Sequence, residues 1–95
     1  MTPKAYTTVI HTLKCWPVYY RAILSGDKTF DIRRGNDRIY QVGDCVDLLE
    51  WDPETMAYTG AHALRRISYV MHGAPLLPDD AWVLALDPGE RSAPL

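Results

Sequence analysis

The 95-residue chain lacks the features that define several protein classes. No apolar run approaches the roughly 18–20 residues that a membrane-crossing helix needs. The first residues lack the apolar stretch of a secretory signal peptide. Repeats and low-complexity segments are absent, and two cysteines are too few for a disulfide scaffold. We therefore expect a cytoplasmic protein that neither spans a membrane nor depends on disulfides.

Cysteine and histidine are scarce and scattered. Cys15 and Cys45 do not form a Cys-x-x-Cys pair, and the three histidines lack the spacing of metal ligands. We expect both thiols to be free and to pack as small apolar side chains. No local signature supports a catalytic pairing of a cysteine with His11 or His72. The sequence thus predicts no metal site and no cofactor.

The chain carries little net charge, −2 at pH 7, and its pI is near 5.8. Dedicated nucleic-acid binders are usually more basic. The charge is unevenly distributed, however. Residues 14–38 hold six basic and three acidic residues, whereas the rest of the chain holds four basic and nine acidic ones. This asymmetry favours an anionic ligand at the N-terminal third, although chance segregation on solvated surfaces is the alternative.

The composition that is present is that of an ordinary globular domain. Hydrophobic residues make up 47% and charged residues 23% of the chain. A chain of this length buries roughly 60–65% of its unfolded surface, which is enough for one modest core. We expect a single domain at residues 8–87, with flexible tails at 1–7 and 88–95.

Hydrophobic periodicity predicts five or so strands and one helix. Alternation between apolar and polar residues indicates strands, whereas Pro17 suits a helix start and Gly26 a helix end. The chain is thus expected to hold one helix at 16–25 and strands at 8–15, 28–34, 45–51, 64–72 (with a start near 58 and a kink at Gly60) and 82–86. One early helix and several strands predict a small α+β domain, closed or partly closed into a barrel that protects the sheet edges.

The position of a side chain in the helical or strand repeat assigns several residues to the core or the surface. Trp16, Tyr20, Ile23 and Leu24 form one apolar stripe along the helix and are expected to face the core. Tyr19 lies off that stripe and is the better candidate for stacking on a ligand. His11 lies in phase with buried positions, which favours a hydrogen-bonded structural histidine. Trp51 and Trp82 are expected in the core.

The strand at 28–34 is the most polar in the chain. Phe30 and Ile32 share one face, whereas Asp31 and Arg33 share the other. An acid and a base two residues apart usually form a surface ion pair. Near a cleft, Arg33 can instead bind a phosphate or carboxylate, with Asp31 orienting it.

An ordered set of motifs over fifty residues carries a family resemblance. The motifs are His11-Thr12-Leu13-Lys14, Gly26-Asp27-Lys28-Thr29-Phe30-Asp31-Ile32-Arg33, Val42-Gly43-Asp44, Asp52-Pro53-Glu54-Thr55 and Tyr58-Thr59-Gly60. This set resembles the ASCH domain of the PUA-like superfamily, most closely a small bacterial and phage branch of unknown function. The resemblance covers about residues 9–87.

The resemblance implies a small PUA-like β-barrel with a helix over one mouth, and work related to RNA. Some ASCH relatives are amidohydrolases that act on acetylated cytidine with a lysine and a threonine. Lys28 matches that lysine and Arg33 matches the motif arginine, but Asp31 stands where the threonine would be. No residue matches the downstream catalytic glutamate of those hydrolases.

Three functions follow as hypotheses. The first is an RNA- or nucleotide-binding module whose basic cleft is formed by Lys14, Tyr19, Lys28, Asp31, Arg33 and Arg34. The second is a small amidohydrolase of a modified nucleoside, with Lys28 and Asp31 as catalytic groups. The third is an interaction protein in which the fold is a scaffold. The sequence leaves the ligand, any protein partner and the oligomeric state open.

Overall fold

The computed structural model describes residues 8–87, so the expected tails at 1–7 and 88–95 lie outside the described residues. The elements, in chain order, are β1 (Ile10–Cys15), α1 (Pro17–Ser25), β2 (Phe30–Arg34), β3 (Cys45–Asp52), β4 (Ala57–His72) and β5 (Ala81–Leu86). The predicted number and order of elements are therefore confirmed for the described part. β4 begins at Ala57 and continues through Gly60 as one strand, close to the start near residue 58 that the sequence indicated.

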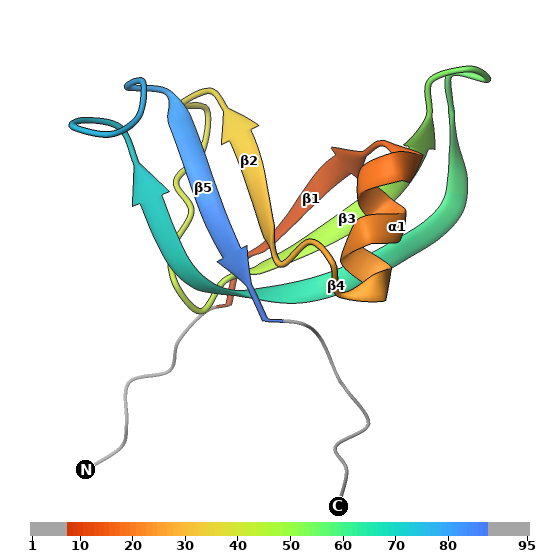
Figure 1. Cartoon of the computed structure of the whole chain (residues 1–95), viewed down its shortest axis with the longest axis horizontal. Helices are drawn as coiled ribbons and strands as arrows, with labels where there is room; N and C mark the ends of the chain where they lie inside the picture. The colour runs from red at the N-terminus through yellow and green to blue at the C-terminus, as the bar shows by residue number, and fades with distance from the viewer. Residues whose placement is uncertain (1–7, 88–95) are drawn as a thin grey trace, which may run out of the picture.

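The five strands form one mixed sheet in the order β1-β3-β4-β5-β2. β1 runs parallel to β3, and the other neighbours are antiparallel. The 16-residue β4 pairs with β3 along its first part and with β5 along its last part. The long strand curves at the base of the molecule, and the two arms of the sheet rise from it on either side (Figure 1).

The sheet is not closed into a barrel, which corrects the prediction of a PUA-like barrel. β1 and β2 are the two outer strands of the sheet order, and no ladder pairs them within the described residues. At these two edges, side chains rather than a partner strand donate hydrogen bonds to backbone carbonyls. Lys28 Nζ donates to the Phe30 carbonyl of β2, and Arg33 Nη2 donates to the Lys14 carbonyl of β1. We call the gap between these two edges the seam.

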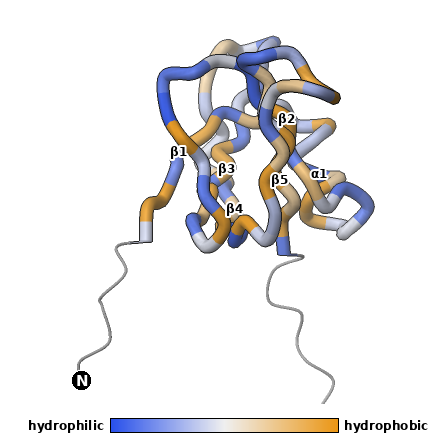
Figure 2. The backbone as a smooth tube through the Cα atoms, turned by 90° about the vertical axis from the view of Figure 1, so that its left-hand side faces the viewer, coloured by the Kyte–Doolittle hydropathy of each residue, from blue (hydrophilic) through white to orange (hydrophobic). Residues whose placement is uncertain are grey.

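Local signals position β1 and α1 as predicted. His11, Leu13 and Cys15 are buried and alternate with exposed residues. Figure 2 shows that hydrophobic and hydrophilic residues are mixed along β1. Pro17 occupies the first turn of α1. Gly26 ends the helix in the left-handed conformation with φ 87°, where its N–H donates to the Ile23 carbonyl.

The predicted apolar stripe of α1 is only half buried. Tyr20 and Ile23 lie in the core, whereas Trp16 and Leu24 are exposed. Trp16 is the N-cap residue and has an extended backbone, so its side chain does not follow the helical period. The short helix packs against β3 and therefore buries a narrow stripe.

The core lies between the arms of the sheet and α1. Its fully buried side chains are Val46, Leu48, Ile67 and Leu84. Trp82 is buried as predicted, but Trp51 is only partly buried because it lies near the end of β3 in the β3–β4 hairpin. The apolar β5 lies between β4 and β2 in the sheet, so it has a neighbouring strand on both sides.

His11 is the predicted structural histidine. It is buried, and its Nε2 lies 2.9 Å from Asp44 Oδ2, which also accepts the Gln41 backbone N–H. Its ring begins a series of aromatic contacts through Tyr40 and Trp82 to His72, with ring centroids 4.6, 5.2 and 3.5 Å apart. This series links β1 to β4 through the interior.

Other sequence expectations concern membranes, metals and thiols. No helix in the described part of the chain is long and apolar enough to cross a membrane. Among residues 8–87, no group of three or more His, Cys, Asp or Glu side chains is arranged to hold a metal ion. Cys15 is buried and Cys45 half-buried, and both are free thiols, as expected.

Candidate ligand-binding site

Strand β2 turns its charged face inward and its apolar face outward. Asp31 is 5% exposed, whereas Phe30 and Ile32 are 42% and 56% exposed. The Asp31 carboxylate accepts a hydrogen bond from Lys28 Nζ at 3.1 Å and another from Arg33 Nε. Two cations around one carboxylate offset the cost of burying it. The three groups together carry one net positive charge.

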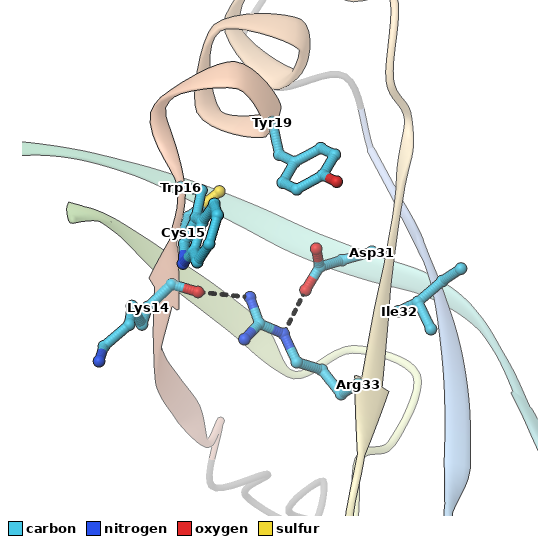
Figure 3. Close-up of a pocket in the computed structure, with 7 residues that line it drawn as sticks. All are labelled: Lys14, Cys15, Trp16, Tyr19, Asp31, Ile32 and Arg33. Carbon is cyan, nitrogen blue, oxygen red and sulfur yellow. Dashed lines mark hydrogen bonds and ion pairs between the residues drawn. The ribbon is translucent and has the colours of Figure 1, made fainter. Parts of the chain in front are cut away.

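Arg33 bridges the seam and is held at two points. Its Nε donates to Asp31, and its Nη2 donates to the Lys14 carbonyl across the seam at 2.8 Å (Figure 3). Among residues 8–87, no acceptor contacts the remaining amino group, Nη1. The guanidinium is thus fixed in place while one of its donor groups stays available to a ligand.

The seam and α1 enclose two adjoining hollows of about 400 Å³ each. They share Tyr19, Asp31 and Ile32, and we call them together the cleft. The full lining is Lys14, Cys15, Trp16, Tyr19, Lys28, Phe30, Asp31, Ile32 and Arg33. Tyr19 and Trp16 are 53% and 49% exposed, and their rings lie on the helix side of the cleft, opposite Asp31 and Arg33 (Figure 3).

The open edge of β2 adds backbone polar groups to the cleft. The Thr29 carbonyl accepts the Leu86 N–H, and the Gly35 N–H donates to the Asp80 carbonyl. Backbone hydrogen bonds of an antiparallel strand point to alternate sides from one residue to the next. The backbone N–H and C=O groups of the odd-numbered residues between Thr29 and Gly35 therefore point toward β5. The peptide groups of Ile32 therefore point to the open edge, where one donor and one acceptor line the cleft.

The structure brings together four of the six side chains predicted for the site. Tyr19, Lys28, Asp31 and Arg33 all line the cleft. The Lys28 ammonium lies 5.7 Å from the Tyr19 ring centroid and 5.0 Å from that of Phe30. A cation, a carboxylate and exposed aromatic faces thus share one small space.

The other two predicted residues are placed differently. Lys14 contributes its carbonyl to the cleft, but its Nζ lies 4.0 Å from the ring centroid of Trp51 and points away from Arg33 (Figure 3). Arg34 lines neither hollow. Its Nε and Nη2 donate to Asp80 Oδ1 at 3.1 and 2.7 Å, and this ion pair lowers the pKa of Asp80. We leave Arg34 out of the proposed site.

Sequence reasoning missed Cys15, Phe30 and Ile32 as lining residues and took Trp16 for core. The alternation of β1 predicts a buried Cys15, and nothing in the sequence shows that the seam beside it stays open. Burial and then the Asp31 carboxylate raise the pKa of the Cys15 thiol, against the opposing effects of Arg33 and Lys28. A buried, protonated thiol is a wall of the cleft rather than a nucleophile.

Comparison with known proteins gives one family and a fold. The family described as "Domain of unknown function (DUF3850)" matches residues 10–86. Among solved structures, the chain is similar to ZmASCH from Zymomonas mobilis, crystallised as a tyrosine-to-phenylalanine mutant. The TM-score is 0.57 at 15% sequence identity, over 81% of this chain and 68% of that one. No curated protein matches. The likeness to ZmASCH shows an ASCH-like fold.

Proposed function

This chain belongs to the DUF3850 family and has an ASCH-like fold, and from that premise we propose that its cleft binds single-stranded RNA or a nucleotide. The observation that carries the proposal is the fixed position of the Arg33 guanidinium in the cleft. Asp31 and the Lys14 carbonyl fix its guanidinium, and its free Nη1 lies in a cleft walled by exposed aromatic rings.

The electrostatics of the cleft fit a phosphate. Lys28 and Arg33 exceed Asp31 by one positive charge, and both cations are held by hydrogen bonds before any ligand arrives. A guanidinium fixed in this way loses little conformational entropy on binding an anion. Charge-assisted hydrogen bonds from such a group are about twice as strong as neutral ones.

The aromatic and backbone groups fit an unpaired base. Tyr19 and Trp16 offer exposed ring faces, and stacking of a base on an aromatic ring is how proteins commonly hold single-stranded nucleic acids. The N–H and C=O of Ile32 at the open edge of β2 match the adjacent acceptors and donors of a base edge. A base within a duplex has its Watson–Crick edge paired and its faces stacked on neighbouring bases, so it cannot enter this cleft.

Hydrolysis of a modified nucleoside is the second candidate, because its two predicted catalytic groups, Lys28 and Asp31, lie together in the cleft. An amine acting as nucleophile or base must first lose a proton. Lys28 Nζ donates to Asp31 Oδ1 at 3.1 Å and to the Phe30 carbonyl at 2.7 Å, so the protein itself already engages this amine as a hydrogen-bond donor. We therefore prefer binding over hydrolysis as the function of this cleft.

The proposal is tested with two matched variants of β2, Arg33→Gln and Arg34→Gln. Each removes one positive charge from the same strand, but only Arg33 lines the cleft. We expect Arg33→Gln to weaken binding of a fluorescein-labelled single-stranded RNA by about ten-fold or more, from the loss of charge-assisted hydrogen bonds. Arg34→Gln is expected to bind within about two-fold of the unmodified protein. Fluorescence anisotropy measures both affinities.

Two outcomes would count against the proposal. Equal losses in both variants would show that binding follows general charge rather than the cleft. Absence of RNA binding at low salt would remove the function itself. Acetylcytidine incubated with concentrated protein is expected to be recovered intact by chromatography, and release of cytidine would favour the hydrolase instead.

A further inference from the structure

We propose that the ligand path continues from the cleft onto the β3–β4 hairpin, where Lys14, Trp51 and Tyr58 form a second subsite. The ligand would then be an oligonucleotide of several residues rather than a mononucleotide. This inference rests on the proposed function, because it adds a second subsite to the same site.

Lys14 lies at the border between the two subsites. Its carbonyl accepts from Arg33 inside the cleft, while its side chain extends outward and places Nζ over the Trp51 ring. Cys15 pairs with Glu50 on β3, so Trp51 is the next residue along the neighbouring strand. The β3–β4 hairpin thus rises directly beside the end of β1 that walls the cleft (Figure 1).

The Lys14 ammonium has no carboxylate partner within the described part of the chain. Lys28, Arg33 and Arg34 each pair with an aspartate, but no ion pair involves Lys14. Its contact with the electron-rich face of the Trp51 indole holds the side chain in place without neutralising its charge. A positioned and unpaired ammonium beside a nucleotide cleft is suited to a phosphate of the same strand.

Tyr58 provides the aromatic surface of the subsite. It pairs with Trp51 across the hairpin, and residues opposite each other on antiparallel strands project to the same face. Its side chain is exposed and makes no hydrogen bond to another residue among 8–87. Phosphate on Lys14 and a base on Tyr58 would therefore bind on one face of the hairpin.

The test compares Tyr58→Leu with Tyr69→Leu. Both tyrosines are exposed on β4, at 55% and 61%, but Tyr69 pairs with β5 in the other arm of the sheet and lines neither hollow. Affinities are measured for an eight-residue single-stranded RNA and for a mononucleotide. We expect Tyr58→Leu to weaken octamer binding about five-fold or more and to leave mononucleotide binding unchanged. Tyr69→Leu should change neither affinity.

Lys14→Gln gives a second, independent arm. It should weaken octamer binding more than mononucleotide binding and reduce the salt dependence of octamer binding. Thermal unfolding confirms that each variant is folded before it is compared. Equal octamer affinities for Tyr58→Leu and Tyr69→Leu would overturn this inference. So would a loss of mononucleotide affinity in Tyr58→Leu or Lys14→Gln equal to the loss for the octamer.

The same data separate this inference from the proposed function. Arg33→Gln is expected to weaken both ligands, because Arg33 lies in the cleft itself. If RNA binding depends on Arg33 but not on Lys14 or Tyr58, only the second subsite is wrong. If the unmodified protein binds neither ligand, the proposed function fails and the subsite fails with it.

Discussion

Asp31 is a buried carboxylate between two cations, and a gain in folding stability does not explain its burial. A buried ion pair often contributes less to folding than well-packed apolar residues of similar volume would. What Asp31 does achieve is geometry, because it fixes Lys28 Nζ and Arg33 Nε on the same side of the cleft. We interpret Asp31 as a positioning residue for Arg33 rather than a group that contacts the ligand.

Cys15 leads to a prediction about thiol reactivity. Because burial and the Asp31 carboxylate raise the pKa of Cys15, its reactive thiolate is scarce near neutral pH. We expect a variant that keeps only Cys15 to react with Ellman's reagent at pH 7.5 about ten-fold more slowly than one that keeps only the half-buried Cys45. In denaturant the two thiols should react at similar rates.

The same raised pKa fixes the direction of a pH effect on stability. The folded state holds the Cys15 proton more tightly than the unfolded state does, so this contribution to the free energy of unfolding is complete below about pH 8.5. It is lost as the pH rises through the folded pKa. Removing Cys15 by Cys15→Ala should therefore reduce the alkaline loss of stability seen in urea unfolding. A fast-reacting native Cys15 would contradict both expectations.

At the level of elements, local signals were sufficient for α1 but not for β2. Pro17 and Gly26 act through their own backbone geometry, so the helix ends could be predicted from the sequence. Alternation correctly separated the two faces of β2, but it could not assign which face is buried. That choice depends on the mutual neutralisation of Lys28, Asp31 and Arg33, which is a tertiary effect.

The outward-facing apolar side chains of β2 lead to a prediction about stability. Ile32 is an apolar strand residue with an exposed side chain, whereas Leu84 on the neighbouring β5 is fully buried. We expect Ile32→Thr to change the free energy of unfolding by less than about 0.5 kcal/mol, because it keeps a β-branched side chain on the surface. Leu84→Ala should cost about 2–5 kcal/mol. Urea unfolding measures both changes.

Comparable losses in these two variants would mean that β2 buries its apolar face and that Asp31 points to solvent. The cleft would then lose its inward-facing charges, and with them the basis of the proposed site. A stability measurement on an exposed isoleucine is thus also a check on the site geometry.

At the level of the whole molecule, the open sheet is what makes the cleft. The motifs could place Tyr19, Lys28, Asp31 and Arg33 in one site because they lie close together in the chain on α1 and β2. They could not show whether β1 and β2 would pair, since that depends on the curvature of β4 and on long-range packing. In a closed barrel, ladder hydrogen bonds would occupy the edge groups that here accept from Arg33 and Lys28.

The distribution of charge over the molecule leads to the last prediction. Among residues 8–87, the cations on the proposed path are Lys14, Lys28 and Arg33, and the chain as a whole has a net charge of −2. If each neutralises one phosphate, log affinity for single-stranded RNA should fall with log salt at a slope of about −2, from roughly −0.7 per phosphate. Anisotropy titrations between about 50 and 200 mM salt give this slope.

The slope also tests whether Lys14 contacts a phosphate of its own. Lys14→Gln should make the slope less steep by about 0.7, because it removes one phosphate contact and leaves the aromatic contacts intact. A slope near zero would mean that stacking and base-edge contacts, rather than phosphates, account for binding. A slope steeper than about −4 would require more cations than the path holds. The RNA would then contact cations outside this path, and Arg21 and Arg65 are the other cations without a carboxylate partner in the described part of the chain.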